Sequence, residues 1–130
     1  MIKLFDPTIG QEEGKVIKKI LYSKFWASGS GSGYVSKFEK AFQKYIKSDR
    51  CITVNSGTAA LNLAFTLFNI KNKEVILPSL SFVSTAHCIV ENGGIPIFVD
   101  VNPNTLCIEP EKIEQAVTKN TIAVLPVHFG

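Results

Sequence analysis

The fold class follows from residues 51–65, CITVNSGTAALNLAF. Residues 51–54 are apolar or β-branched and are typical of a short strand. The Ser-Gly-Thr at 56–58 then opens a predicted helix in which residues 59–68 are nearly all apolar. A helix that is apolar on so many sides is buried on more than one face, either in a layered α/β structure or at a subunit interface.

The residues that follow repeat this alternation of strand and helix. Three further strands are predicted from β-rich runs bounded by turn residues: 74–77, 95–99 and 121–127. A helix from 82 to about 92 separates the first two, with Ser81 as a suitable N-cap and Gly93 beyond its end. Pro110 suits the first turn of the helix before the last strand. Four strands joined by long crossovers predict right-handed βαβ units and a mainly parallel sheet with helices on both faces.

Two helices are predicted ahead of this α/β region. Apolar residues recur at helical spacing between 35 and 46, where Ser36 and Glu39 match a capping box. Residues 11–25 carry a second amphipathic pattern. The SGSGSG run at 28–33 is expected to be a mobile loop between them.

Composition excludes several classes of protein. The 130 residues, 45% of them hydrophobic, suit one ordinary domain or a piece of a larger one. A net charge of +3 is too small for non-specific binding to nucleic acid. The amino terminus lacks a signal-peptide core and no apolar run is long enough to span a bilayer, so neither secretion nor a membrane span is expected. Three cysteines without C-x-x-C spacing indicate reduced thiols in a cytoplasmic protein, and no metal site is expected.

The turn at 56–58 is the most informative candidate site. In open parallel sheets, ligands bind beyond the carboxyl ends of the strands. Ser56, Gly57 and Thr58 would present backbone N–H groups, two hydroxyls and the positive end of a helix dipole to one point. This combination is typical of an anion site, most naturally for phosphate. The alternative is a capped helix in which Gly57 merely allows tight packing.

Three more residues follow predicted strands and have two interpretations each. Phe82 offers a ring face on which a flat ligand can stack, or is a core aromatic. Asp100 is a carboxylate facing a ligand or an ordinary turn residue. His128 is free to act as an acid, a base or a donor, or it makes a structural hydrogen bond.

Several motifs in order carry a resemblance to a known family. They are NSGTAAL at 55–61, PSLSFVSTA at 78–86, GIPIFVDV at 94–101 and PVHFG at 126–130. From about residue 26 onward the chain resembles the DegT/DnrJ/EryC1/StrS family of pyridoxal-phosphate-dependent sugar aminotransferases. The resemblance implies the amino-terminal part of a fold-type-I large domain in a homodimeric, cytoplasmic enzyme. It divides the chain into a helical segment with the Gly/Ser loop, 1–34, and a partial cofactor-binding domain, 35–130.

The resemblance also implies roles for particular residues. Ser56, Gly57 and Thr58 would hold the phosphate of pyridoxal 5′-phosphate, and Phe82 would stack on its pyridine ring, with Ser81 and His128 as further residues lining the site. The implied reaction moves an amino group, usually from glutamate, to a nucleotide-linked 4-keto-6-deoxy or 3-keto sugar. The products of such enzymes enter lipopolysaccharide, surface glycan or antibiotic sugars.

The chain is much shorter than members of that family. It ends before the family's Schiff-base lysine and before the aspartate that pairs with the pyridine nitrogen, so no catalytic residue is expected within 1–130. Alone, the chain is expected to be inactive. Two alternatives remain: a truncated, non-catalytic module that associates with a full-length relative, and a relative of the dehydratases that use the same cofactor without that lysine.

Overall fold

The computed structural model describes residues 6–25 and 33–129, in two compact units, residues 1–53 and 54–130. The loop predicted at 28–33 lies outside the described residues except for Gly33. None of the helices in the described ranges combines the length and hydropathy that a bilayer-spanning segment needs. The three cysteines are free thiols.

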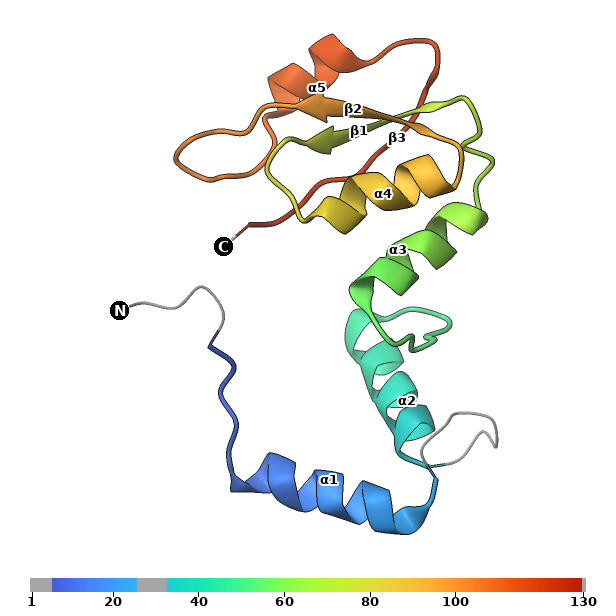
Figure 1. Ribbon diagram of the computed structural model, residues 1–130, viewed down its shortest axis with the longest axis vertical. Coiled ribbons are helices and arrows are strands. Elements are labelled where there is room, and N and C mark those ends of the chain that lie inside the picture. The colour runs from blue at the N-terminus through green and yellow to red at the C-terminus, as the bar shows by residue number, and fades with distance from the viewer. Residues whose placement is uncertain (1–5, 26–32, 130) are drawn as a thin grey trace. The chain divides into compact units, whose positions relative to one another are not determined.

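The first unit contains the two predicted helices, α1 (Gln11–Ser23) and α2 (Tyr34–Ile46) (Figure 1). Gly33 precedes α2 with φ at 97°, a conformation that an L side chain rarely adopts. The capping box predicted for α2 is wrong. The Glu39 carboxylate instead accepts hydrogen bonds from the amide and the hydroxyl of Thr53, at 2.9 and 3.0 Å. This contact ties the segment after α2 back onto the helix.

The second unit is built on a parallel sheet of three strands, ordered β2-β1-β3. Its strands are β1 (Glu74–Pro78), β2 (Ile95–Val99) and β3 (Thr121–Val124). In the central strand, Val75, Ile76 and Leu77 are fully buried, as expected for a strand with neighbours on both sides. The predicted parallel sheet with crossover helices is therefore confirmed.

Two strand predictions need correction. Residues 51–54 do not form a strand, because a strand requires a hydrogen-bonded neighbour and none pairs with this segment among the described residues. The last strand is shorter than predicted and ends at Val124. Beyond it, one further amide, that of Leu125, donates to the carbonyl of Ile76 at 2.8 Å.

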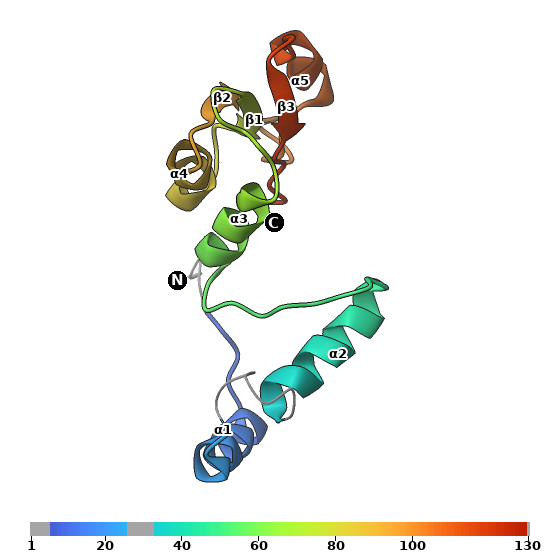
Figure 2. The same cartoon turned by 90° about the vertical axis from the view of Figure 1, so that its right-hand side faces the viewer.

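Helices cover both faces of this sheet. The second unit contains α3 (Gly57–Thr66), α4 (Val83–Glu91) and α5 (Pro110–Ala116). The two views agree that α4 and α5 lie on opposite sides of the strands (Figures 1 and 2). Helix α3 packs against α4. An apolar hollow of about 300 Å³ lies between α3 and β3, with Leu61 and Phe65 on one side and Val124 on the other.

The end of α4 is fixed by two glycines, as predicted. Gly93, at φ 77°, donates to the Val90 carbonyl and Gly94 donates to the Ile89 carbonyl, both at 2.9 Å, which completes a Schellman motif. Gly94 also lies against the core. A Cβ at this position would stand 2.8 Å from Ile89 Cγ2 and 2.9 Å from Ile70 Cδ1. Position 94 therefore requires glycine.

The connection from β2 to α5 contains a turn that is closed by a β-bridge. Val101 and Ile108 form an isolated antiparallel bridge, and between them the Asn102 side chain accepts from the amide of Asn104 at 2.9 Å. Pro110 is the first residue of α5, as predicted.

Candidate functional site

The start of α3 has donors that the helix itself does not use. Ser56 is the N-cap: its hydroxyl accepts from the amide of Ala59 and its carbonyl accepts from the amide of Ala60, both at 3.1 Å. The amides of Gly57 and Thr58 precede the first intrahelical bond and have no partner within 6–25 and 33–129. Residues 56–58, which we call the 56–58 turn, are all exposed.

The space in front of this turn is open. A Cβ built on Gly57 would meet no other atom within 4 Å. Two free amides, two hydroxyls and the positive end of a ten-residue helix thus meet at an exposed turn. The residues present therefore fit an anion the size of a phosphate group.

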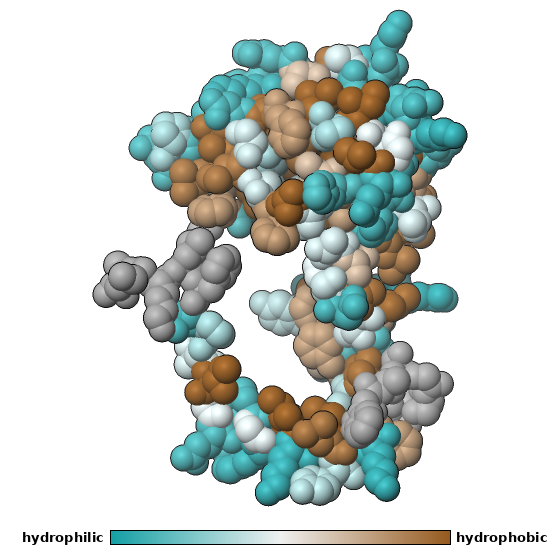
Figure 3. Space-filling view, viewed as in Figure 1, coloured by the Kyte–Doolittle hydropathy of each residue, from teal (hydrophilic) through white to brown (hydrophobic). Residues whose placement is uncertain are grey.

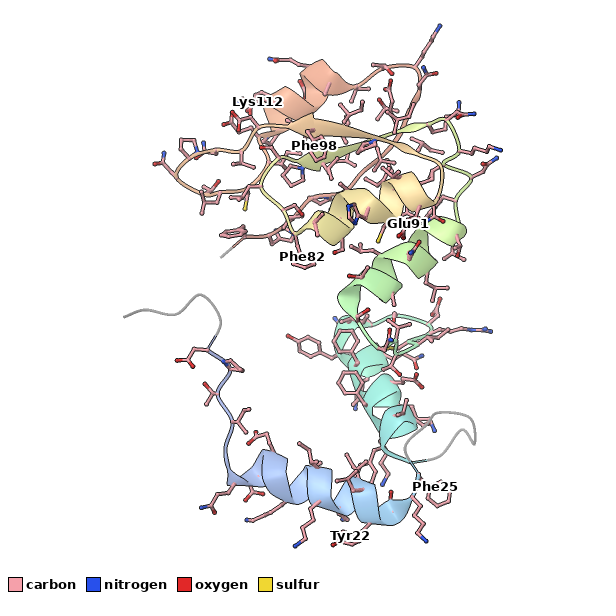
Figure 4. The ribbon with its side chains drawn as sticks, in the orientation of Figure 1. Tyr22, Phe25, Phe82, Glu91, Phe98 and Lys112 are labelled. Carbon is pink, nitrogen blue, oxygen red and sulfur yellow. The ribbon has the colours of Figure 1, made fainter. Side chains whose placement is uncertain are left out.

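Phe82 is the N-cap residue of α4, with extended backbone angles of −69° and 142°. Its side chain is 74% exposed and projects from the beginning of the helix (Figure 4). The interpretation of Phe82 as a core aromatic is therefore wrong. The space-filling view shows other apolar side chains exposed on the same unit (Figure 3).

Side-chain bonds show that α3 and α4 run in the same direction. The Cys88 thiol donates to the Thr58 carbonyl at 3.5 Å, and the Asn62 amide donates to the Glu91 carboxylate at 2.6 Å. The partners advance together along both helices, so both N-termini point the same way. Cys88 lies level with Thr58, and Phe82 precedes Cys88 by six residues. At a rise of about 1.5 Å per residue, Phe82 therefore lies about 9 Å beyond Thr58, measured along α4 toward its N-terminus.

These N-termini lie toward the carboxyl ends of the strands. Helix α4 follows β1 directly and returns along the sheet, so its first residues stand where β1 ends (Figure 1). Asp100 directly follows β2 at the same edge, whereas His128 comes four residues after the end of β3. His128 is exposed. Asp100 accepts from the amide of Val101 at 2.9 Å and lies 3.6 Å from the Lys112 ammonium, which favours its interpretation as a turn residue.

The prediction that Ser81 caps α4 is wrong, because the helix begins one residue later, after Phe82. The Ser81 hydroxyl donates instead to the hydroxyl of Thr85 at 2.6 Å. Within the described residues, no three His, Cys, Asp or Glu side chains gather as a metal site.

Cys88 is the buried thiol behind the 56–58 turn. Burial raises the pKa of this thiol, and the nearby Glu91 carboxylate raises it further. The folded protein therefore favours the protonated form, which is also the form that donates to Thr58.

We expect Cys88 to resist alkylation. Iodoacetamide should modify Cys51 and Cys107, which are partly exposed, at least about tenfold faster than Cys88 at neutral pH. The pKa of the Cys88 thiol is higher in the folded protein than in the unfolded chain. The protonated thiol therefore contributes its full stabilisation of the fold below the ordinary thiol pKa, and this contribution is lost as the pH rises through the folded pKa. Mass spectrometry of digests after timed labelling measures the three rates. If Cys88 in the folded protein were alkylated as fast as Cys51 and Cys107, and as fast as in urea, it could not be a buried, protonated thiol.

With the geometry established, comparison with known proteins decides the family. Residues 7–130 match the DegT/DnrJ/EryC1/StrS aminotransferase family. The chain belongs to this family.

Two relatives that the chain matches are proteins of Bacillus subtilis. The chain is 43% identical over 125 residues to the spore coat polysaccharide biosynthesis protein SpsC of Bacillus subtilis, covering 95% of this chain and 31% of SpsC. It is 41% identical over 97 residues to the 3-oxo-glucose-6-phosphate:glutamate aminotransferase of the same organism, covering 74% of this chain and 22% of that protein.

The fold agrees with solved structures from the family. The structure of the E. coli GDP-4-keto-6-deoxy-D-mannose-3-dehydratase with bound hydrated PLP superposes with a TM-score of 0.82 at 31% identity, covering 95% of this chain and 33% of the dehydratase. The expected fold class, the α/β architecture of fold-type-I pyridoxal-phosphate enzymes, is confirmed. The chain spans between a fifth and a third of the length of these three family members.

Sequence reasoning predicted the 56–58 turn and Phe82 as site residues but did not identify the side-chain bonds around them and between α3 and α4. Asn62, Thr85 and Cys88 look like ordinary helix residues in the sequence. One signal was present: Ser81 lies just before the helix and only four residues from Thr85 in its first turn, close enough for the two side chains to meet. Nothing local pointed to the pairing of Thr58 with Cys88.

Proposed function

We propose that this chain is part of a pyridoxal-phosphate-dependent aminotransferase that aminates a nucleotide-linked keto sugar, either 4-keto-6-deoxy or 3-keto, with glutamate as donor. The observation that carries the proposal is the exposed 56–58 turn with its unused amides, at the start of a helix that packs against α4, whose N-cap is the exposed Phe82. The names of the relatives support the substrate class, since they include a GDP-linked keto sugar and a glutamate-dependent amination.

The 56–58 turn would hold the cofactor phosphate. The amides of Gly57 and Thr58 and the Thr58 hydroxyl can each donate to a phosphate oxygen, and the α3 dipole favours a dianion there. The Ser56 hydroxyl, which donates to Asn55 Oδ1 at 3.4 Å, would turn from that oxygen to the phosphate. Phe82 would cover one face of the pyridine ring, fixing its plane and excluding water from that face. Ser81 and His128 would line the same edge.

Pyridoxal phosphate, when bound, supplies an electron sink for proton removal at the carbon that bears the amino group. In the overall reaction, the amino group of glutamate moves to the keto carbon of the sugar; the ketone oxygen of the sugar leaves as water, and a water molecule supplies the keto oxygen of 2-oxoglutarate. We assign the residues of 1–130 to binding and orientation and none of them to the proton transfer.

Wider properties of the protein are part of the same proposal. Residues 35–130 are the partial cofactor-binding domain and residues 1–34 the amino-terminal segment. The enzyme is a cytoplasmic homodimer, and its product enters lipopolysaccharide, surface glycan or antibiotic sugar synthesis.

Two alternatives make different predictions. The similarity to the GDP-4-keto-6-deoxy-D-mannose-3-dehydratase favours a cofactor-dependent dehydratase as the second candidate function. Given glutamate and a GDP-linked 4-keto-6-deoxy sugar, an aminotransferase yields 2-oxoglutarate and an amino sugar, whereas a dehydratase yields a sugar that has lost water. A non-catalytic module would yield neither product and would bind no cofactor.

Binding of pyridoxamine 5′-phosphate tests the proposed site without requiring a lysine. We expect the ³¹P resonance of this ligand to shift on adding the chain, and the amide resonances of Gly57 and Thr58 to move most in the protein spectrum. Pyridoxamine, which lacks the phosphate, should bind at least about tenfold more weakly, because each charge-assisted hydrogen bond contributes about 1.5–3 kcal/mol. Equal binding of the two compounds would contradict the proposal.

A further inference from the structure

The segment between β1 and α4 is held at both of its ends. At the start, the amide of Ser79 donates to the Val99 carbonyl of β2 at 2.8 Å. At the end, the Ser81 hydroxyl donates to the Thr85 hydroxyl at 2.6 Å, and the amide of Thr85 donates to the Phe82 carbonyl at 3.0 Å. Thr85 therefore contacts the residue before Phe82 through its side chain and Phe82 itself through its backbone.

Thr85 and Phe82 differ strongly in burial. Thr85 is only 6% exposed, whereas Phe82 is 74% exposed. A side chain as exposed as Phe82 gains little positional restraint from packing, so the backbone that carries it sets the direction in which the side chain leaves the chain. That backbone is fixed by the bonds to Thr85, a residue that the core of the unit immobilises.

We propose that Thr85 is a positioning residue for the cofactor: through Ser81 and the Phe82 carbonyl, it holds the Phe82 ring where it can stack on the pyridine ring. This inference rests on the proposed function, because it concerns the same site. Thr85 does not touch the ligand in this proposal. Its hydroxyl acts only by holding Ser81, the residue before Phe82, while its backbone amide binds the Phe82 carbonyl.

A purely structural role for the Ser81–Thr85 bond makes a different prediction. If the bond only helped α4 to form, its loss would weaken all ligand binding equally. If it positions the ring, its loss should impair stacking and leave the phosphate at the 56–58 turn. Two signals of bound pyridoxamine 5′-phosphate separate these outcomes: the ³¹P shift reports the phosphate, and the upfield ring-current shift of the pyridine protons reports stacking on Phe82.

Thr85→Val is the informative variant, because valine keeps the shape of the buried side chain and removes only the hydroxyl. We expect the upfield shift of the pyridine protons to fall by about half or more, while the ³¹P shift and the affinity for inorganic phosphate stay within about twofold. Thr85→Ser restores the hydroxyl and should restore the ring-current shift. Thr66→Val is the matched control: it removes a hydroxyl that bonds only within α3, to the Leu63 carbonyl, and should change neither signal.

The outcomes are distinguishable from those of the proposed function. If the parent chain shows no ³¹P shift, the proposed function itself fails. If the parent shows both signals and Thr85→Val retains the ring-current shift, or loses both signals together, the positioning role is overturned. Should Thr85→Val fail to fold, Ser81→Ala decides instead: it breaks the same bond from the exposed side, and an unchanged ring-current shift in that variant would overturn the proposal.

Discussion

Gly57→Val should weaken the binding of pyridoxamine 5′-phosphate by about tenfold or more, since a charge-assisted hydrogen bond to phosphate contributes about 1.5–3 kcal/mol. The valine side chain has room in the folded chain, because a Cβ at this position meets nothing within 4 Å. The same open space is where we place the phosphate. The substitution therefore blocks the ligand without disturbing the described packing, and the ³¹P titration measures the loss directly.

Two variants serve as comparisons for Gly57→Val. Thr58→Ala removes one hydroxyl donor and leaves both amides, so its effect should be smaller, about threefold to tenfold. Gly14→Ala replaces an exposed glycine of α1 that also has nothing within 4 Å, and should leave phosphate binding unchanged. Unchanged affinity in both Gly57→Val and Thr58→Ala would refute the assignment of the phosphate to the 56–58 turn.

Gly94→Ala should destabilise the second unit by about 1–3 kcal/mol, the usual cost of forcing an extra carbon into a packed core. The new Cβ would lie within 3 Å of side-chain atoms of Ile70 and Ile89, and 3.1 Å from the Ile89 carbonyl oxygen. Both isoleucines are almost fully buried, so neither can move aside without disturbing the core cluster. Urea unfolding followed by circular dichroism should show a lower midpoint.

Gly14→Ala is again the matched control. Alanine in an exposed helix interior is about 0.5–1 kcal/mol better than glycine, so α1 should be unchanged or slightly more stable. The unfolding transition of residues 54–130 should not move in this variant. An unfolding midpoint for Gly94→Ala equal to that of the parent chain would show that the contact with the isoleucines is not tight.

The parts of the fold that could be predicted are those with local causes. The strand β1 and the helix α4 are bounded by their own turn residues, and the ending of α4 at Gly93 follows from the conformation that only glycine adopts easily there. The parallel pairing followed from the length of the crossovers. Such features depend on residues close together in the sequence.

The features that could not be predicted depend on distant partners. Residues 51–54 have the composition of a strand, but composition does not supply the neighbour that makes one. Glu39 fits a capping box by spacing, yet its carboxylate binds Thr53, 14 residues further along. For residues 51–54 a missing strand neighbour, and for Glu39 a contact with a distant residue, decided which local structure formed.

The candidate site also has features that local sequence predicts and features that depend on distant partners. The 56–58 turn and Phe82 follow from the chemistry of a helix start and from the position after a strand. Their alignment depends on bonds between residues about thirty apart, Thr58 with Cys88 and Asn62 with Glu91, which no local pattern encodes. Sequence reasoning could therefore propose candidate binding groups but not the contacts between α3 and α4 that align them.

The bridge between Val101 and Ile108 also bears on how the protein can change over evolution. It seals the base of the turn, so residues 102–107 can lengthen without moving β2 or α5. Doubling the length of a flexible loop costs only about 0.6 kcal/mol. The α4–β2 connection has no such tolerance, because Gly94 fits against the core. Insertions that add new ligand contacts are therefore tolerated in the turn after β2. They are not tolerated in the α4–β2 connection, at the opposite edge of the sheet.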